Sequence, residues 1–362
     1  MSQHYIGVMS GTSLDGVDVA LCKIDAKGCK LLASYEHPFP SALKEEVLHT
    51  ITHAVTLQMI GELDIKLGRL FAKAINTFIE KNALLREESR AIGLHGQTLW
   101  HAPNSSYPFS MQLGSANEVG AATGIDVIAD FRGADVANGG EGAPFAPAFH
   151  QEIFSHLGNN IAVVNIGGMA NISYLGKELL GWDIGCGNVL MDAFMQRTQN
   201  RAYDKEGAFA KSGSVNMELL QAMLKDEYFT KLPPKSTGRE YFNEAWLDSY
   251  LQDFQGISDA DIQRTLLELT VTTIANEANR LRVEKLIICG GGTKNSFLMQ
   301  RFDVLCRAEV SKSDTYGVSS DFLEAMIFAW LAYKRVHRER VNLKSVTGAK
   351  KNAILGAYYA AN

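Results

Sequence analysis

The chain has 362 residues, of which 46% are hydrophobic and 21% charged. These are the proportions of a globular protein long enough for two domains. The 35 Lys and Arg residues face 40 Asp and Glu residues, so the net charge of −5, without a basic cluster, excludes a nucleic-acid-binding surface. The five cysteines are too few and too scattered for a disulfide framework, and none of them forms a CxxC pair, which argues against a structural zinc site.

The N-terminus lacks a secretory signal pattern, and no run of 18 apolar residues occurs. We therefore expect a cytoplasmic protein that does not partner a membrane.

The first elements are expected to be two antiparallel strands around a polar turn. Residues 5–9 form a short apolar run, and residues 17–24 alternate apolar with other residues. The turn between them, MSGTSLDG, combines glycine, hydroxyl and acidic residues. Two helical patterns follow in residues 41–85, the longer around 65–79, and a short strand at 91–94 leads into HGQT.

A second half opens near residue 134. The Gly- and Pro-rich stretch VANGGEGAPFAP (136–147) is typical of a crossover between domains. Residues 161–175 again give a buried strand, a glycine turn and a second strand, which suggests a diverged repeat of residues 5–21. Residues 286–289 form a buried strand that ends in three glycines before a helix expected at 296–305. Strands alternating with helices predict an α/β fold.

The glycine turns are candidates for binding an anion, because glycine lets backbone N–H groups approach a ligand closely. The chain carries no GxxxxGK[ST] loop at these turns, and the first turn returns into a strand, which excludes a dinucleotide-binding fingerprint. One such hairpin alone is also typical of an ordinary turn. Two hairpins followed by a strand–GGG–helix element predict a nucleotide held between two domains.

This combination resembles the superfamily of sugar kinases, actin and heat-shock chaperone ATPases, and within it the anhydro-N-acetylmuramic acid kinase family. The resemblance covers essentially the whole chain in the family's order. Its motifs are GVMSGTSLDGVD (7–18), GLHGQT (93–98), IADFRGADVANGGEGAP (128–144), NIGGMANIS (165–173), WDIGCGN (182–188), PPKSTGRE (233–240), ICGGG (288–292) and DFLEA (321–325).

The resemblance implies a two-domain actin-like ATPase fold with a nucleotide cleft between the lobes. The N-terminal lobe is expected to span residues 1–133, with the tail 353–362 as a candidate addition, and the C-terminal lobe residues 134–352. It also implies a homodimer and an ATP- and Mg²⁺-dependent kinase. Such a kinase phosphorylates 1,6-anhydro-N-acetylmuramic acid at O6 while water opens the anhydro bridge, which yields N-acetylmuramic acid 6-phosphate in peptidoglycan recycling.

The ATP-binding residues are expected in the three glycine loops. The wider superfamily often begins the first loop as Asp-x-Gly-Thr, but Met9 holds that place here, so we expect Asp15 to lie near Mg²⁺. Asp18, by its strand alternation, is alternatively a solvent-facing residue. The expected ATP-binding residues are Gly11, Thr12, Ser13, Leu14, Asp15, Gly16, Val17 and Asp18, then Gly167, Gly168 and Asn171, and finally Gly290, Gly291, Gly292 and Asn295.

Asp183 is the expected catalytic base that activates water. It follows an apolar run, where partial desolvation keeps a carboxylate basic, and the resemblance places the family's catalytic aspartate here. The alternative is a cap on the helix that begins near Asn188. The surroundings depart from the family pattern Asp-Thr-Gly-Pro-Gly-Asn, because Ile184 and Cys186 replace Thr and Pro.

Four residues are expected to bind the sugar. The guanidinium of Arg132 suits the lactyl carboxylate or a phosphate, with an ion pair to Asp130 or Asp135 as the alternative. The resemblance puts a sugar-contacting residue at Glu324, which alternatively favours the dipole of its helix. His95 and Gln97 are expected to form hydrogen bonds with sugar hydroxyls. The alternative for His95 is a buried histidine of the core.

Two alternative functions stay open. One is a kinase of the same fold that acts on another amino sugar or a carboxylate. The other is a nucleotide-switched binding protein like the chaperones, which we disfavour because a separate peptide-binding domain would have to follow residue 352.

Overall fold

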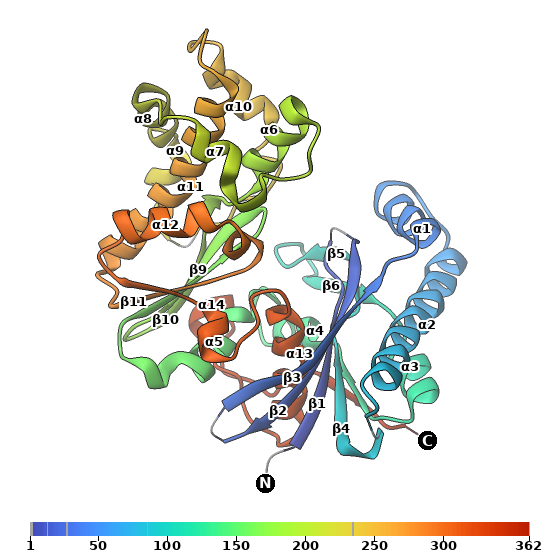
Figure 1. Ribbon diagram of the computed structural model, residues 1–362. Helices are drawn as coiled ribbons and strands as arrows, with labels where there is room; N and C mark the ends of the chain where they lie inside the picture. Colours follow the sequence, from blue (N-terminus) through green and yellow to red (C-terminus); the bar gives the residue numbers. More distant parts are fainter. Residues whose placement is uncertain (1–2, 13, 27, 85, 234, 362) are drawn as a thin grey trace. The chain divides into compact units, whose positions relative to one another are not determined.

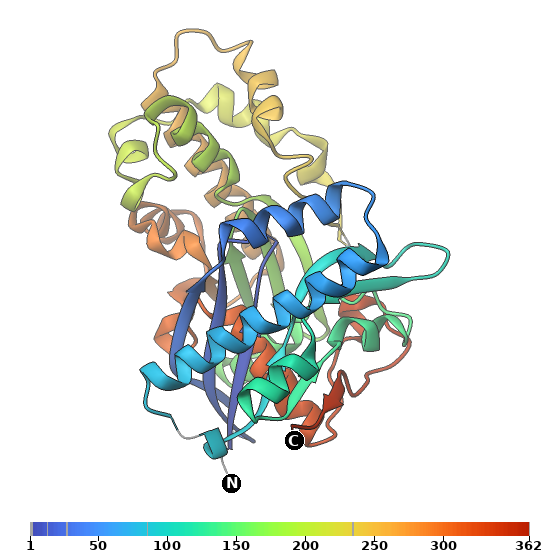
Figure 2. The same ribbon diagram turned by 90° about the vertical axis from the view of Figure 1, so that its right-hand side faces the viewer.

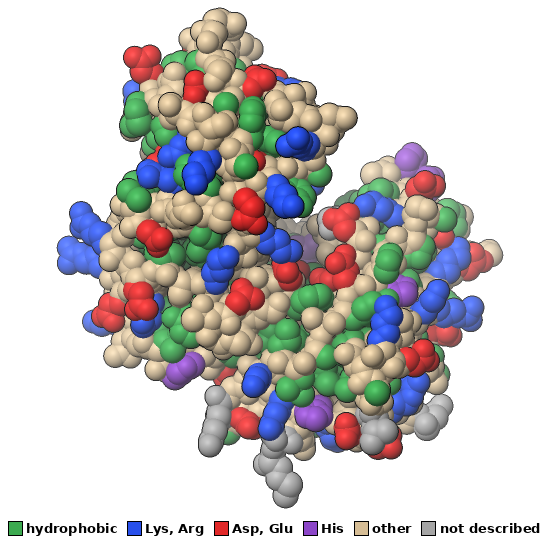
Figure 3. All heavy atoms as spheres, in the orientation of Figure 1, with side chains coloured by type: hydrophobic (Ala, Val, Ile, Leu, Met, Phe, Trp, Pro, Cys, Tyr) green, Lys and Arg blue, Asp and Glu red, His purple; other side chains and the backbone are tan. Residues whose placement is uncertain are grey.

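The computed structural model describes residues 3–12, 14–26, 28–84, 86–233 and 235–361. The chain forms two compact units, which Figures 1 and 2 show from two sides. Unit 1 comprises Met1–Ile153 and Phe322–Asn362, and unit 2 comprises Phe154–Asp321. No helix in the described part of the chain is long and apolar enough to cross a membrane. On the face shown in Figure 3, acidic and basic side chains are interspersed.

The two units meet after residues 153 and 321, whereas the boundaries were expected after residues 133 and 352. The rings of Phe145 and Phe149 pack against Phe328 and Trp330 of the C-terminal segment, at centroid distances of 6.4 and 5.6 Å. These aromatic contacts tie residues 134–153 and the segment after residue 321 into unit 1.

The sheet of unit 1 has six strands in the order β13-β7-β4-β1-β2-β3. The first three strands form an antiparallel meander, β4 and β7 are parallel to β1, and β13 closes the edge antiparallel to β7. A separate hairpin joins β5 to β6. The strands are β1 (Gln3–Met9), β2 (Gly16–Asp25), β3 (Gly28–Pro38), β4 (Ser89–Leu94), β5 (Gln97–Ala102), β6 (Phe109–Leu113), β7 (Val127–Ala129) and β13 (Ala357–Tyr359).

Helices cover the sheet of unit 1. The long helix predicted around residues 65–79 is α2, and its apolar side packs with Ile6 and Val8 of β1 in one core. Figure 2 shows α2 lying across the sheet. The helices of unit 1 are α1 (Ser41–Thr52), α2 (Leu57–Lys81), α3 (Ala116–Thr123), α4 (Phe131–Val136), α5 (Ala146–Phe154, whose last residue belongs to unit 2), α13 (Leu323–Val336) and α14 (Lys344–Thr347).

Two glycines let α13 lie directly on the strands. Gly7 of β1 and Gly93 of β4 are register partners. A Cβ atom added to Gly7 would lie 1.8 Å from the Ala325 carbonyl oxygen, and one added to Gly93 would lie 1.9 Å from that of Phe328. Only glycine therefore fits between the sheet and the backbone of this helix.

The sheet of unit 2 has five strands in the order β10-β9-β8-β11-β12. The antiparallel β8–β9 hairpin has β11 parallel to β8, as the β1–β2 hairpin has β4 parallel to β1. This repeat confirms the predicted α/β, two-domain actin-like ATPase fold. The strands are β8 (Ile161–Ile166), β9 (Met169–Leu175), β10 (Leu179–Cys186), β11 (Lys285–Cys289) and β12 (Glu309–Lys312).

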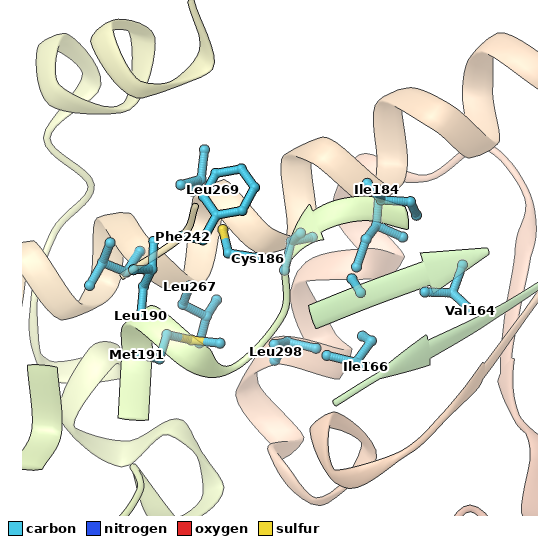
Figure 4. Packing of buried hydrophobic residues seen from close by; sticks show 14 of the residues in the cluster. Val164, Ile166, Ile184, Cys186, Leu190, Met191, Phe242, Leu267, Leu269 and Leu298 are labelled. Atoms are coloured by element: carbon cyan, nitrogen blue, oxygen red, sulfur yellow. The ribbon is translucent and has the colours of Figure 1, made fainter. Parts of the chain in front are cut away.

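The core of unit 2 lies between this sheet and its helices. Figure 4 shows Ile166 of β8 beside Leu298 of α12, and Cys186 of β10 near Leu269 of α11. This packing positions the ends of the strands and the starts of α6 and α12. The helices are α6 (Val189–Gln199), α7 (Ala208–Ser212), α8 (Met217–Leu224), α9 (Glu227–Thr230), α10 (Glu244–Leu251), α11 (Asp259–Leu281) and α12 (Ser296–Leu305).

Candidate functional site

The first glycine hairpin joins β1 to β2 in unit 1. Leu14 adopts a left-handed φ of 55°, and its N–H donates to the Gly11 carbonyl over 3.3 Å, which closes a tight turn. Thr12 is exposed and Gly11 half-buried, so both can meet a ligand. Gly16, Val17 and Asp18 already belong to β2, where the Val17 side chain is buried in the core. Ser13 lies outside the described residues.

Gln97 braces this hairpin from β5. Its buried Oε1 accepts a 2.8 Å hydrogen bond from the Ser10 hydroxyl, and its Nε2 donates to the Gly11 carbonyl over 3.4 Å. Gln97 was expected to bind the sugar, but its amide oxygen and nitrogen form hydrogen bonds with the glycine turn instead.

Asp15 is the expected ligand of Mg²⁺. Its side chain is 73% exposed, and its Oδ1 lies 3.2 Å from the ammonium of Lys44. Among the described residues no group of three or more His, Cys, Asp or Glu side chains could hold a metal. A single exposed carboxylate beside a glycine turn still suits Mg²⁺, because this ion keeps several of its waters and needs only one or two protein carboxylates.

Arg132 and His95 form a hydrogen-bonded pair in unit 1. The Arg132 Nε–H donates to His95 Nε2 over 2.9 Å, and Nη1–H donates to the Gly142 carbonyl over 3.0 Å. Burial and the charge of Arg132 lower the pKa of His95 to about 3, so the ring is neutral and carries its proton on Nδ1. The histidine thus holds the guanidinium in place as an acceptor.

The alternative partners of Arg132 are engaged elsewhere. Asp135 accepts hydrogen bonds from the Gly142 N–H and from the Thr347 hydroxyl. Asp130, which precedes α4, accepts a hydrogen bond from the backbone of Gly133. No ion pair joins either carboxylate to Arg132 among the described side chains.

Glu324 lies in the first turn of α13. Its side chain remains accessible to solvent, yet the surrounding protein removes enough water to raise the pKa of its carboxyl, and the charge of Arg132 opposes this rise. Unit 1 thus brings a carboxylate and a guanidinium from distant parts of the sequence into electrostatic range, where they can bind polar and anionic groups of a ligand.

The second glycine hairpin joins β8 to β9 in unit 2. The Gly168 carbonyl accepts N–H groups from Gly187 and Val189 over 2.9 and 3.1 Å, and the Gly167 carbonyl accepts that of Asn188 over 2.8 Å. The backbone N–H groups at the start of α6 therefore hold the carbonyl oxygens of this turn in place.

Asn171, Asn165 and Asp183 lie opposite one another on three neighbouring strands. Asn171 of β9 pairs with Asn165 of β8 and with Asp183 of β10. Residues in such a cross-strand row point to the same face of the sheet. The three polar side chains therefore share one face beside the second glycine turn.

Asp183 is held by a segment that follows α9. Its Oδ2 accepts the Thr237 N–H over 3.1 Å, and its own N–H donates to the Lys235 carbonyl over 3.1 Å. Burial raises the pKa of this carboxyl, the Thr237 hydrogen bond lowers it, and the charge of Glu240 raises it. The helix-cap alternative does not apply, because the N-cap of α6 is Asn188. The geometry suits a general base.

Two of the three glycines after β11 pack closely against β8. A Cβ atom on Gly290 would lie 2.2 Å from Asn165 Oδ1, and one on Gly292 would lie 2.5 Å from Ile166 Cγ2. Gly290 also has a φ of 82°. These two glycines are needed for packing and turn geometry, whereas Gly291 lines a pocket.

This pocket lies entirely within unit 2 and has a volume of about 300 Å³. Burial raises the pKa of Asp192 in its wall to about 6, although the charge of Arg239 lowers it. Asn295, predicted to bind ATP, lines the pocket and also caps α12 by accepting the Leu298 N–H over 2.9 Å. The pocket is lined by Asn188, Met191, Asp192, Ala202, Tyr203, Asp204, Glu206, Gly291, Lys294 and Asn295.

Sequence reasoning missed part of this lining. Asp192, Tyr203 and Glu206 come from α6 and the segment after it, which carried no recognised motif. Arg239 lay within the quoted motif PPKSTGRE, but the sequence supplied no reason to select it. Its neighbours in the fold come from other strands and helices.

The chain is similar to known proteins over nearly its whole length. A family model described as anhydro-N-acetylmuramic acid kinase matches residues 3–361. A relative of that name from Sulfurimonas denitrificans is 53% identical, covering 99% of this chain and all of the relative. Another from Pasteurella multocida is 46% identical, covering 99% and 97%. Among solved structures, component A of (R)-2-hydroxyglutaryl-CoA dehydratase from Acidaminococcus fermentans gives a TM-score of 0.48 at 10% identity, covering 92% of this chain and 99% of that one.

Proposed function

Because the chain belongs to the anhydro-N-acetylmuramic acid kinase family, we propose that it phosphorylates 1,6-anhydro-N-acetylmuramic acid with ATP. The proposed product is N-acetylmuramic acid 6-phosphate, formed while water opens the anhydro bridge, as a step in cell-wall recycling. The observation that carries the proposal is Asp183, a carboxylate of raised pKa held beside a glycine turn.

Asp183 is the base in this reaction. It takes a proton from water, whose oxygen forms a bond to C1 of the sugar as the C1–O6 bond breaks. The electron pair left on O6 attacks the γ-phosphorus of ATP, and the bond to the ADP oxygen breaks. A carboxylate of raised pKa is a stronger base, and the Thr237 N–H fixes its orientation.

Unit 1 supplies the groups that we assign to the sugar. Arg132 pairs with the carboxylate of the lactyl group, which its planar fork fits, and neutral His95 keeps the guanidinium oriented. Glu324 accepts hydrogen bonds from sugar hydroxyl or amide groups. Its charge partner Arg132 favours the ionised carboxylate that this role requires.

The nucleotide is assigned to the glycine loops and to the pocket of unit 2. Gly11 and Thr12 of the first hairpin, braced by Gln97, and Gly168 of the second bind phosphate oxygens through backbone N–H or hydroxyl groups. The pocket next to Gly291 receives the nucleoside. Asp15 would hold Mg²⁺, which when bound neutralises phosphate charge.

The test is an assay with ATP, Mg²⁺ and the anhydro sugar in ¹⁸O-labelled water. We expect ADP and a sugar 6-phosphate carrying one ¹⁸O at C1 and none in the phosphate. Preformed product incubated in labelled water corrects for exchange at C1. Faster phosphorylation of N-acetylmuramic acid or N-acetylglucosamine than of the anhydro sugar would refute bridge opening and favour a kinase for another amino sugar.

A further inference from the structure

Arg239 belongs to a short segment that is attached to the strand carrying Asp183. Lys235 accepts the Asp183 N–H through its carbonyl, and the Thr237 N–H donates to the Asp183 carboxylate, both over 3.1 Å. Two residues further on, the Arg239 carbonyl accepts a 3.3 Å hydrogen bond from Asn243 Nδ2 at the start of α10. These hydrogen bonds anchor the backbone of Arg239 and of the residues just before it.

The guanidinium of Arg239 faces the second glycine turn. Outside the adjoining residues, the atom nearest to a methyl carbon placed on Gly168 would be Arg239 Nη2 at 3.5 Å, followed by Nε at 3.7 Å and Val189 Cβ at 4.0 Å. The guanidinium therefore lies close to the turn, and the missing side chain of Gly168 leaves the path between them open.

The charge of Arg239 has no close counterpart in the protein. The side chain is exposed and forms no ion pair with a carboxylate among the described residues. Its charge acts on Asp192 only at a longer range, beyond that of an ion pair. The carbonyls of the turn are already occupied by N–H groups from the start of α6. The guanidinium therefore offers donors to a ligand that approaches the turn.

We infer that Arg239 binds an anionic phosphoryl oxygen of the nucleotide at the Gly167–Gly168 turn and stabilises the charge on that group during transfer. The inference rests on the proposed use of ATP. A guanidinium suits this role because its planar donors match phosphate oxygens and its charge does not titrate. The same segment holds Asp183, so one stretch of chain positions both the base and the cation.

The experiment compares Arg239→Gln and Arg239→Lys with the control Arg307→Gln. Arg307 is also exposed in unit 2, but it precedes β12, whose start pairs with the start of β11, away from the glycine end of that strand. We expect Arg239→Gln to lower kcat about 100-fold, the size of effect typical for one lost donor to developing charge. Arg239→Lys should retain part of the activity and Arg307→Gln all of it.

Binding measurements separate a phosphate contact from other roles. Calorimetry should show weaker binding of ATP and ADP by Arg239→Gln and unchanged binding of adenosine and of the sugar, with the thermal midpoint also unchanged. Guanidinium ion should partly restore the activity of Arg239→Ala, which a merely structural arginine would not allow.

Three results would overturn the inference. If Arg239→Gln lost affinity for ATP and adenosine equally, Arg239 would act on the nucleoside or on folding. If it lost affinity for the sugar alone, Arg239 would bind the sugar carboxylate. Wild-type kinetics of Arg239→Gln would leave the residue without a role. If the wild-type protein fails to phosphorylate the anhydro sugar, the proposed function fails, whereas the nucleotide-binding arms still test Arg239.

Discussion

Asp183 combines the two properties that a base needs, orientation and a raised proton affinity. The Thr237 N–H fixes one carboxylate oxygen, and burial raises the pKa above that of an ordinary aspartate. Thr237 lies far from Asp183 in the sequence, so the hydrogen bond could not be predicted from the motif WDIGCGN. The desolvation of the carboxylate, in contrast, was expected from the apolar run before it.

Asp183→Asn should abolish most turnover, by at least about 100-fold, because the amide cannot take the proton from water. ATP affinity should stay within about twofold in calorimetry, since no phosphate contact is assigned to this side chain. In the wild-type protein, kcat/KM should fall as the pH drops through the raised pKa, because only the ionised carboxylate is a base. The exposed Asp253→Asn serves as control. Turnover retained by Asp183→Asn would remove the assignment.

Asp192 should make the protein less stable at high pH. Its folded pKa of about 6 exceeds the ordinary value, so the folded state binds more protons than the unfolded state between about pH 4 and 6. The free energy of unfolding therefore falls as the pH rises through this window. Asp192→Asn removes the buried charge and should be more stable by about 1–3 kcal/mol at pH 8.

Urea unfolding of the nucleotide-free protein at pH 8 and pH 4 checks this expectation. Most of the gain of Asp192→Asn should be lost at pH 4, where the folded wild-type carboxyl is protonated and about half of the unfolded carboxyls are protonated as well. A gain of the same size at both pH values would show that the charge is not its cause.

At the scale of elements, the close approach of α13 to β1 and β4 depends on two strand glycines. Gly7 and Gly93 lie side by side, and a side chain at either position would collide with backbone carbonyls of α13. The two strands and the apolar helix that begins near Glu324 were expected from the sequence, but the packing of this helix on the strands was not. Glycine within a strand signals a close approach without saying which segment approaches.

Gly93→Ala should lower the free energy of unfolding by about 1–3 kcal/mol, because the added methyl overlaps the Phe328 carbonyl and α13 must shift. Gly61→Ala is the matched control, since this glycine is exposed near the start of α2 and a Cβ atom there meets nothing within 4 Å. It should raise stability by up to about 1 kcal/mol. Urea unfolding of both variants measures the difference, and a stable Gly93→Ala would contradict the packing argument.

At the scale of the whole molecule, the two units differ in how the chain builds them. Unit 2 is one continuous stretch, whereas unit 1 needs the segment after residue 321 to supply α13 and β13. Each unit has its own apolar core. The expected boundary near residue 134 followed the Gly- and Pro-rich stretch, which lies within unit 1.

Unit 2 expressed alone as residues 154–321 should fold, with helical circular dichroism and a single cooperative urea transition, because its core is formed within this stretch. A chain ending at residue 321 should leave unit 1 unfolded or aggregated, because the faces of β1 and β4 that bear Gly7 and Gly93 lose their covering helix. Cooperative unfolding of unit 1 in that truncated chain would contradict this division of the molecule.

The sequence by itself determined the glycine hairpins, the strands beside them and the α/β class, because turn chemistry and apolar alternation act between neighbouring residues. The family was indicated by the resemblance of its motifs. Only the tertiary structure decided that Gln97 braces the first hairpin, that Arg132 meets His95, and that Thr237 orients Asp183. It also brought Arg239 to the turn at Gly168. These contacts join residues far apart in the chain, and their geometry follows from how strands and helices pack, which no local pattern encodes.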